Sequence, residues 1–398
     1  MSKLDDLINE FCPNGVEYQP LGSLIKRERE KGKHCPNITQ VYAISNTLGV
    51  VRSEDLHEGT TYSEKTENYT ILRHGMFAYN PSRLNIGSIG LLKSDTEGLV
   101  SPMYVVFSVN KKVDCAYLEQ FLKSSYAKNK INSLKEEGAR YRFDFKRWNY
   151  IEIPIPPLPV QKEIVRILDK FTELTTELTT ELTLRKKQYE YYRDFLLSEE
   201  QLGEEVDYLP LGSLIKRERE KGKRCPNITQ VYAISNTLGV VRSEDFHEGT
   251  TYSEKTDNYT ILRRGMFAYN PSRLNIGSIG LLKDDIEGLV SPMYVVFSVD
   301  KKVNCAYLEQ FLKSSYAKNK INSLKEEGAR FRFDFKRWNY IQIPLPPLKV
   351  QDRVVKILDK FDSLVNDLSK GLPAEIEARK KQYEYYRDKL LSFKNIED

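Results

Sequence analysis

The chain has 398 residues, of which 40% are hydrophobic and 29% charged, and its 61 basic and 56 acidic residues give a formal net charge of +5. This length exceeds one ordinary domain, and the composition excludes an intrinsically disordered chain. The sequence holds neither an apolar run of about 18 residues nor a cleavable leader, so we expect a cytoplasmic protein without membrane contact. Its five cysteines lack CxxC spacing and it has four histidines, so we expect free thiols and no metal site.

A stretch of about 140 residues occurs twice in the chain, at an offset of 190 residues. The sequence PLGSLIKREREKGK starts at residue 20 and again at residue 210, and the shared register continues to residues 161 and 351. Between residues 20 and 161 the copies differ at 12 positions, which in the first copy are 34, 56, 67, 74, 94, 96, 110, 114, 141, 152, 155 and 159. Such a unit is too long for a solenoid repeat. Each copy is therefore expected to be a whole domain, followed by a helical segment.

Each copy carries signals for both strands and helices. Short β-branched or aromatic stretches predict strands at residues 41–45, 104–109 and 150–155. Apolar residues with helical spacing predict a helix over residues 116–136. Turn-rich pieces such as residues 80–90 separate these elements. The predicted fold class is α+β, with two tandem, strand-rich domains.

A long helical pattern follows each copy. Residues 160–198 contain neither Gly nor Pro and carry an apolar stripe. A helix of about 39 residues would be roughly 58 Å long, so its stripe needs a partner. After the second copy, helical patterns at residues 350–368 and 374–391 are interrupted by Gly371 and Pro373. We expect the helical segments to pair as an antiparallel coiled coil with pseudo-two-fold symmetry; the alternative is that each lies separately on its own domain.

The tetrapeptide TELT occurs three times in tandem at residues 172–183, inside the first long helix. Threonine is a poor helix former, so the repeat does not maximise helix stability. Four residues are close to one turn, and one added unit lengthens a helix by about 6 Å while rotating its apolar stripe by only about 40°. The repeat is therefore a segment whose length can change with little disturbance of the helix surface.

A decapeptide, RKKQYEYYRD, marks both helical segments. It begins at residues 185 and 379, an offset of 194 instead of 190, so the segments differ by four residues. In the first helix the apolar spacing of 3, 4 and 4 has an 11-residue period, which predicts a straight or slightly right-handed coil. The residues expected to form the spacer and partner helices are Phe171, Leu174, Leu178, Leu182, Tyr189, Tyr192, Tyr383 and Tyr386.

Sequence motifs for catalysis are absent: the chain has no GxSxG, HExxH, Walker A or GxGxxG. The segment YNPS at residues 79–82 is similar to the NPPY-type motif of amino-methyltransferases, but it lacks the second proline and the stacking aromatic residue. No glycine-rich cofactor loop precedes it. We therefore expect a non-catalytic chain; the alternative, a chain that itself methylates DNA, would require it to bind S-adenosylmethionine.

Three basic clusters in each copy favour nucleic-acid binding, because Arg and Lys neutralise phosphates and Arg, Asn and Ser can contact base edges. The first cluster, residues 26–33, alternates with acidic residues and is typical of a solvated helix face. The second, residues 80–90, combines polar side chains with glycines that allow close approach. The third, residues 138–147, is either a DNA contact or an edge strand with its aromatic residues inward. The predicted DNA-binding residues are Asn80, Ser82, Arg83, Asn85, Ser88, Arg140, Arg142, Lys146, Asn270, Ser272, Arg273, Asn275, Ser278, Arg330, Arg332 and Lys336.

Two α+β domains, each followed by a long helix with PIPPLPVQKEIVRILDKF and RKKQYEYYRD segments, resemble the specificity subunit of a Type I restriction-modification system. The resemblance covers essentially the whole chain from residue 11. It implies target recognition domains at residues 1–159 and 201–349, each reading one half of a bipartite site in double-stranded DNA. It also implies spacer helices at residues 160–200 and 350–398.

The resemblance further implies partners that carry the chemistry. Two modification subunits would bind S-adenosylmethionine and methylate adenine, restriction subunits would use ATP and Mg²⁺, and this chain would hold no cofactor. Family members carry tetrapeptide repeats in the central helix, and the repeat number is associated with the spacer between half-sites. Recognition domains within one subunit usually differ, whereas here they are nearly identical, so we expect a palindromic target. The alternative function is a stand-alone DNA-binding or scaffold protein that dimerises through its long helices.

Overall fold

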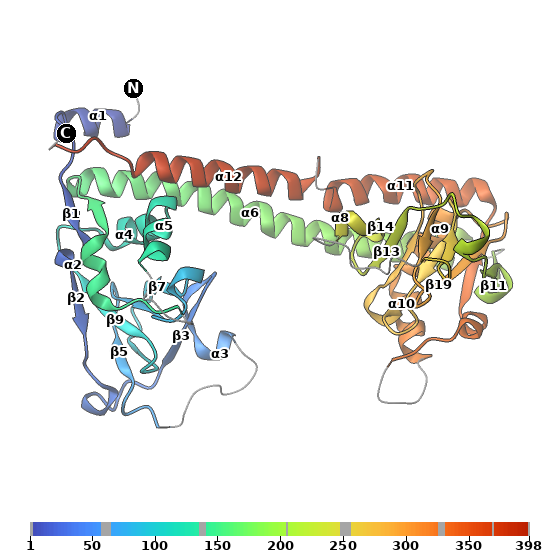
Figure 1. Ribbon diagram of the computed structural model, residues 1–398, viewed down its shortest axis with the longest axis horizontal. Helices are drawn as coiled ribbons and strands as arrows, with labels where there is room; N and C mark the ends of the chain where they lie inside the picture. Colours follow the sequence, from blue (N-terminus) through green and yellow to red (C-terminus); the bar gives the residue numbers. More distant parts are fainter. Residues whose placement is uncertain are drawn as a thin grey trace. The chain divides into compact units, whose positions relative to one another are not determined.

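The computed structural model describes residues 3–56, 65–134, 141–203, 206–246, 256–324, 331–367 and 370–396. The chain forms two compact units (Figure 1). The first unit comprises Met1–Leu178 and Ile376–Asp398, and the second comprises Thr179–Glu375. Each unit contains one copy of the duplicated sequence, which we call the first repeat (residues 20–161) and the second repeat (residues 210–351).

The first repeat folds into two four-stranded sheets and a short ribbon. The strands are β1 (Tyr18–Pro20), β2 (Ile25–Glu28), β3 (Val41–Ser45), β4 (Gly49–Arg52), β5 (Thr70–Leu72), β6 (Phe77–Tyr79), β7 (Ile89–Leu91), β8 (Gly98–Val100), β9 (Val105–Val109) and β10 (Glu152–Pro154). One sheet has the order β4-β3-β8-β5, the other β2-β9-β6-β7, and β1 pairs with β10. All pairs are antiparallel except β3 with β8. The three strands expected from the sequence correspond to β3, β9 and β10.

The second repeat has the same topology. Its strands are β11 (Asp207–Pro210), β12 (Ile215–Glu218), β13 (Val231–Ser235), β14 (Gly239–Arg242), β15 (Thr260–Leu262), β16 (Phe267–Tyr269), β17 (Ile279–Leu281), β18 (Gly288–Val290), β19 (Val295–Val299) and β20 (Gln342–Leu345). The sheets run β14-β13-β18-β15 and β12-β19-β16-β17, with a β11-β20 ribbon. The expected α+β class with two tandem strand-rich domains is confirmed.

Helices cover the sheets and extend beyond them. The α-helices are α1 (Lys3–Phe11), α2 (Leu21–Leu24), α3 (Ser53–Leu56), α4 (Cys115–Leu122), α5 (Ser125–Ser133), α6 (Leu158–Leu196), α7 (Glu199–Leu202), α8 (Ser243–Phe246), α9 (Cys305–Leu312), α10 (Ser315–Ser323), α11 (Leu348–Asn366) and α12 (Leu372–Leu390). The 3-10 helices are η1 (Gly32–His34), η2 (Leu84–Ile86), η3 (Phe145–Tyr150), η4 (Leu211–Ser213), η5 (Gly222–Arg224), η6 (Leu274–Ile276) and η7 (Phe335–Tyr340). No helix in the described part of the chain is long and apolar enough to span a membrane.

The single helix expected over residues 116–136 is two helices, α4 and α5. The break falls at Ser124, whose Oγ accepts the Ala127 N–H at 3.2 Å and caps α5. Serine prefers this N-cap position to a helix interior, because its side chain competes for backbone N–H groups. Of the five apolar residues that give this segment its helical spacing, Leu118, Phe121, Leu122 and Ile131 are buried, whereas Tyr126 is 44% exposed.

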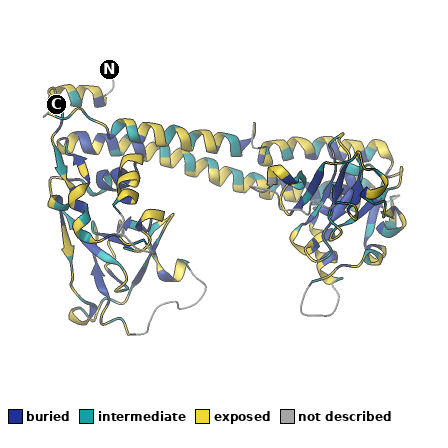
Figure 2. Cartoon of the chain, viewed as in Figure 1, coloured by how far each residue is buried: buried dark blue, intermediate teal, exposed yellow. Residues whose placement is uncertain are grey.

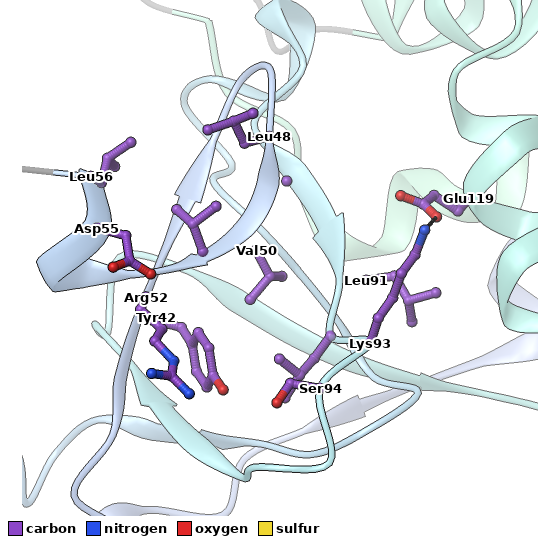
Figure 3. Close-up of a pocket in the computed structure, with 13 residues that line it drawn as sticks. Tyr42, Leu48, Val50, Arg52, Asp55, Leu56, Leu91, Lys93, Ser94 and Glu119 are labelled. Carbon is purple, nitrogen blue, oxygen red and sulfur yellow. Dashed lines mark ion pairs between the residues drawn. The ribbon is translucent and has the colours of Figure 1, made fainter. Parts of the chain in front are cut away.

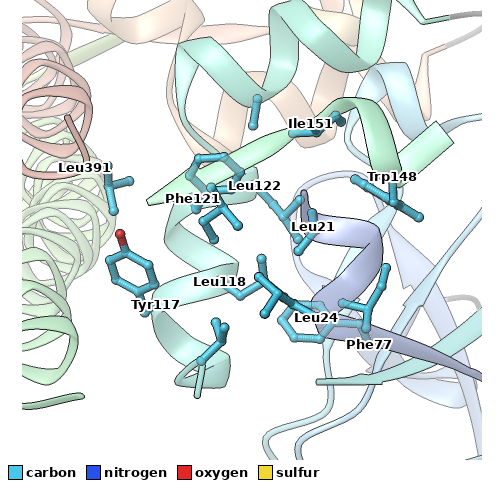
Figure 4. Close-up of a cluster of buried hydrophobic side chains, with 14 of the residues drawn as sticks. Leu21, Leu24, Phe77, Tyr117, Leu118, Phe121, Leu122, Trp148, Ile151 and Leu391 are labelled. Atoms are coloured by element: carbon cyan, nitrogen blue, oxygen red, sulfur yellow. The ribbon is translucent and has the colours of Figure 1, made fainter. Parts of the chain in front are cut away.

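Aromatic and aliphatic side chains from sheets, helices and the C-terminal segment form the core of the first unit (Figure 4). Trp148 and Tyr117 are fully buried there, and the rings of Phe77 and Phe107 stack with centroids 5.1 Å apart. Leu391, which follows α12, belongs to the same core. Burial of such side chains contributes about 1.5–3 kcal/mol each. The C-terminal segment is therefore part of the first unit's folded core.

The long helices pair in an antiparallel order. α6 has 39 residues, as expected. In the second segment α11 ends at Asn366 and α12 begins at Leu372, so Gly371 lies directly before α12 and Pro373 lies in its first turn. Within the first unit the ring of Phe171 in α6 stacks on Tyr386 of α12, with centroids 5.4 Å apart. Within the second unit the ring of Tyr192 in α6 stacks on Phe361 of α11 at 5.2 Å. Because earlier residues of α6 meet later residues of the partner segment, the predicted antiparallel packing is confirmed.

The TELT segment is a regular part of α6 (Figure 2). Its threonine hydroxyls donate to carbonyls one turn earlier, as from Thr175 to Phe171 at 2.8 Å and from Thr176 to Thr172 at 2.8 Å. Such bonds satisfy the hydroxyls within the helix itself. In the predicted apolar stripe Leu178 and Leu182 are half-buried, whereas Leu174 is 47% exposed.

The decapeptides dock onto the repeats in a crossed manner. In the first unit the Tyr383 hydroxyl of α12 donates to Gln120 Oε1 of α4 at 2.6 Å. In the second unit the Tyr189 hydroxyl of α6 donates to Gln310 Oε1 of α9 at 2.9 Å. Each decapeptide therefore binds the repeat that does not immediately precede its helical segment. Asp388 and Asp194 add equivalent bonds, since each accepts a backbone N–H at the start of α5 or α10 at 3.0 Å.

Candidate nucleic-acid interface

The candidate interface is built around the turn that joins β6 to β7, which we call the reading loop (residues 80–90, and residues 270–280 in the second repeat). Asn80 shapes the turn, because its Oδ1 accepts the Ser82 N–H at 2.9 Å and its own N–H donates to the Ser88 carbonyl at 2.9 Å. Leu84 is buried and anchors the loop to the core. Backbone bonds within the loop thus define which side chains it presents.

Two glycines allow the reading loop to pack against the turn between β3 and β4. Gly87 has a φ of +92°, in the left-handed region that favours glycine. At Gly90 an added Cβ would lie 2.5 Å from the Val50 nitrogen, too close for any other residue. The β3–β4 turn carries Leu48, which is 69% exposed. The two turns therefore form one continuous surface.

The structure separates the predicted loop residues into outward and inward ones. Ser82, Arg83 and Asn85 are exposed, whereas Asn80 is half-buried and engaged in the turn. Ser88 is buried, and its Oγ donates to the Ile44 carbonyl at 3.3 Å, so it joins the reading loop to β3 and does not face solvent. The second repeat is equivalent: Ser272, Arg273 and Asn275 are exposed, Asn270 is engaged in the turn, and Ser278 is buried.

Sequence reasoning missed two apolar side chains beside the loop. Ile86 is 54% exposed next to Asn85, and Met103 is 58% exposed with its sulfur 3.9 Å from the Asn80 Nδ2. An isoleucine within a polar, glycine-containing turn is the signal that identifies the first of these. Apolar side chains of this kind can contact the thymine methyl group in the major groove.

The third basic cluster joins the reading loop through the backbone. The Phe143 N–H donates to the Pro81 carbonyl at 2.9 Å, which places Arg142 beside the loop. Phe143 is fully buried, whereas Arg142 and Lys146 are exposed. Arg332 and Lys336 are exposed likewise in the second repeat. The predicted residues Arg140 and Arg330 lie outside the described residues.

The edge-strand alternative for this cluster is wrong about the secondary structure. It is right that the aromatic side chains of the cluster point inward. Residues 141–144 form no strand, and residues 145–150 form η3, which Asp144 caps by accepting the Lys146 N–H at 2.9 Å. Arg147 is a structural residue, because its Nη1 donates to the Leu134 carbonyl at 2.8 Å. Burial raises the pKa of Tyr141 to about 12, so its phenol stays neutral. Asp144 is exposed within the cluster, so its carboxylate partly offsets the positive charges of Arg142 and Lys146.

The first basic cluster differs from its predicted helix face. Residues 25–28 form β2, which pairs antiparallel with β9. The alternation of basic and acidic residues is a strand period in this context, because successive side chains of a strand point to opposite faces. Its charges are partly neutralised, since Lys26 lies 3.6 Å from Glu28 and Arg73 forms an ion pair with Glu30 at 2.6 Å.

The YNPS segment places its tyrosine in the core. Tyr79 is fully buried, and its ring packs edge-on against Trp148 with centroids 5.7 Å apart. Burial raises the pKa of Tyr79 well above its usual range. This ring supports the base of the reading loop and has no free face. Among the described residues, no group of three or more His, Cys, Asp or Glu side chains is arranged to hold a metal ion.

Comparison with known proteins identifies the architecture. The family model described as Type I restriction modification DNA specificity domain matches residues 37–185 and 220–378. The chain is 30% identical over 426 residues to the EcoR124I/EcoR124II specificity subunit of Escherichia coli, and the match covers 99% of this chain and 97% of that one.

A solved structure has the same fold. A chain from a structure described as the basis of complex assembly and conformational transition of the type I R-M system superimposes with a TM-score of 0.60 at 16% identity, covering 96% of this chain and 98% of that one. The HsdS subunit from Thermoanaerobacter tengcongensis matches with a TM-score of 0.49 at 16% identity, covering 96% and 97%. The chain therefore belongs to the specificity subunits of type I restriction-modification systems, the non-catalytic components that carry DNA specificity.

Proposed function

We propose that the two repeats read the same short DNA sequence, so that the target is an interrupted palindrome. The observation that carries this proposal is the equivalence of the two reading loops. Residues 80–90 and 270–280 are identical in sequence. Their turns use the same Asn–Ser bond, and Gly87 and Gly277 both have a φ of +92°. Two loops with identical side chains on equivalent backbones favour identical bases.

Within each repeat we assign base contacts to the reading loop and backbone contacts to the third cluster. Arg83 and Asn85 are exposed at the turn, and arginine and asparagine can form paired hydrogen bonds with guanine and adenine edges. Arg142 and Lys146 flank the loop, are exposed, and form no ion pair with another described residue, so they suit phosphates. The proposed contact set is Ser82, Arg83, Asn85, Arg142 and Lys146, with Ser272, Arg273, Asn275, Arg332 and Lys336. Ser88 and Ser278 are left out because they are buried, and Asn80 and Asn270 act by shaping the loop.

Methylome sequencing of a host that carries the complete system tests the palindrome. We expect methylated adenines in a bipartite motif whose two halves are reverse complements. Two unrelated half-sequences would contradict the proposal. Replacement of both Arg83 and Arg273 by Ala should relax specificity at one position per half-site, at about 1–3 kcal/mol per lost base contact. Replacement of both Lys146 and Lys336 is the matched control, since it should weaken all sequences equally and reduce the salt dependence.

We further propose that residues 1–159 and 201–349 are the recognition domains and that residues 160–200 and 350–398 set the spacer. In this arrangement the helices dock two modification subunits, which supply S-adenosylmethionine and methylate adenine. Restriction subunits would add ATP and Mg²⁺ chemistry. Support comes from α6, where Leu174 remains exposed in the apolar stripe.

The TELT repeat gives the spacer a test. Removal of one TELT unit shortens α6 by about 6 Å. Because its threonines bond within the helix, the flanking helix surfaces should survive the deletion. We expect the unread spacer to change by about one base pair, an axial step of about 3.4 Å, while the methylated half-sequences stay the same. Altered half-sequences would contradict a spacer role for the repeat.

A further inference from the structure

The two repeats differ in charge at a pocket beside the reading loop. In the first repeat a pocket of about 380 Å³ is lined by residues that include Tyr42, Arg52 and Ser94 (Figure 3). Leu48 and Gly49 also line it, and they belong to the turn against which the reading loop packs. The pocket therefore adjoins the surface that we assign to DNA.

Position 94 is one of the few at which the repeats differ, and both residues close the same turn. Ser94 Oγ accepts the Thr96 N–H at 3.1 Å. Its counterpart, Asp284, accepts the Ile286 N–H through Oδ1 at 3.2 Å. The exchange of serine for aspartate thus preserves the turn and adds one carboxylate oxygen.

The added oxygen of Asp284 contacts Arg242 and Tyr232, the counterparts of two residues that line the pocket of the first repeat. Its Oδ2 lies 2.8 Å from Nη2 of Arg242 and accepts the Tyr232 hydroxyl at 3.3 Å. The Arg242 guanidinium holds the pKa of Asp284 below its usual range, so the carboxylate stays charged. The second repeat therefore shows where an anionic oxygen fits in this fold, between the arginine and the tyrosine.

In the first repeat none of the described residues places a carboxylate at that position. Arg52 is exposed and makes no ion pair with any described residue. The Glu119 carboxylate at the other side of the pocket is bound by Lys93 at 2.8 Å and by Lys123 at 2.9 Å (Figure 3). Asp55 lines the pocket as well, without an ion pair to Arg52 in the described structure. The arginine thus offers a positive charge and hydrogen-bond donors to an external anion.

We propose that Arg52 binds a phosphate oxygen of the DNA backbone and that Asp284 blocks the equivalent contact at Arg242. This proposal rests on the DNA-reading role proposed above. A phosphate oxygen replaces the carboxylate oxygen that the second repeat supplies from its own chain. Because phosphate contacts carry no sequence information themselves, the repeats read the same bases while binding the backbone unequally.

Reciprocal exchange of the two residues tests the proposal. Ser94→Asp and Asp284→Ser each introduce a residue that the other repeat already accommodates, so folding should be preserved. The full chain, assembled with the modification subunit of its system, is titrated with duplex DNA carrying its methylated site at several salt concentrations. Each phosphate contact contributes about 0.9 to the slope of log affinity against log salt concentration. Ser94→Asp should reduce the slope by about 0.9, and Asp284→Ser should increase it by about 0.9.

Two further variants sharpen the result. Thr96→Ile introduces the uncharged residue that the second repeat has at the equivalent position, and it should leave the slope unchanged. Arg52→Ala should reduce the slope by the same amount as Ser94→Asp, and the variant with both changes should show no further reduction. The proposal is overturned if the wild-type assembly binds its site but neither exchange alters the slope. It is also overturned if inorganic phosphate binds at Arg52 while the slope for DNA binding is the same in the wild type and the variants. The pocket would then bind a small anion and not the DNA backbone. Failure of the palindrome proposal would be distinguishable from these outcomes, because it would appear as two unrelated methylated half-sites.

Discussion

The crossed docking of the helices makes a prediction about which unit each helix stabilises. Tyr383→Phe removes the hydroxyl that donates to Gln120 Oε1 at 2.6 Å but keeps the ring that packs near Phe171 and beneath Arg387. Gln120 is 5% exposed, so its oxygen would lose its partner without gaining water. Such an unsatisfied group costs about 1–3 kcal/mol. Tyr189→Phe should have an effect of similar size in the second unit, where Gln310 is 4% exposed.

Hydrogen exchange measured segment by segment is the appropriate assay, because a chain with two units does not unfold in one step. Tyr383→Phe should accelerate exchange in α4 and α12 by about 5–150-fold, which corresponds to 1–3 kcal/mol, and leave α9 unchanged. Tyr189→Phe should do the reverse. Tyr385→Phe is the control, since its ring is 61% exposed. Exchange that increases in α9 for Tyr383→Phe, or in α4 for Tyr189→Phe, would refute the crossed docking.

Three other substitutions test the core, the reading loop and a buried carboxylate. Gln161 is fully buried, accepts the Asp114 N–H at 2.8 Å and donates to the Lys112 and Pro156 carbonyls at 2.9 and 2.7 Å. Gln161→Ala should therefore destabilise the first unit by about 3 kcal/mol, measured as lost protection from hydrogen exchange. An effect below about 0.5 kcal/mol would contradict this role. Gly90→Ala should separate the two turns and abolish methylation of the site in vivo while the helices keep their circular dichroism, whereas unchanged methylation would show that the loop tolerates the movement. Hydrogen bonds from Arg166, together with Lys3, hold the pKa of Glu163 at about 2. This lowered pKa gives stability that is complete above the usual glutamate pKa and is lost as the pH falls toward 2. Glu163→Gln should therefore flatten the decline of the urea midpoint between about pH 5 and pH 2, and an unchanged decline would contradict the linkage.

Patterns local in sequence predicted the domain repeat, the long helices and several strands. The strand at residues 41–45 and the 39-residue helix were predictable because their signals lie in the spacing of apolar residues. The division between α4 and α5 depended on Ser124, a single capping residue within an otherwise helical pattern. The strand β2 was predicted as a helix face, because alternating charges are compatible with the period of a helix and with that of a strand. Only the pairing of β2 with β9 distinguishes the two.

The candidate interface was predictable in place but not in detail. The sequence singled out residues 80–90 by composition, yet the inward direction of Ser88 depends on Ile44 in β3, 44 residues away in sequence. The role of Asp284 depends on Arg242, which lies on another strand of the fold. The docking of Tyr383 on Gln120 joins residues 263 positions apart. Contacts of this range arise from tertiary packing, which no local pattern specifies.

The participation of Leu391 in the core of the first unit has a consequence for synthesis on the ribosome. The first repeat leaves the ribosome early, but Tyr383 and Leu391 follow more than 200 residues later. Every residue of the second unit, Thr179–Glu375, is made before them. Because domains fold as their residues emerge, the second unit can be completed while the first still exposes the surface that α12 will cover. Nascent chains halted near residue 375 should therefore contain a protease-resistant second repeat and a protease-sensitive first repeat, so that the older part of the chain matures last.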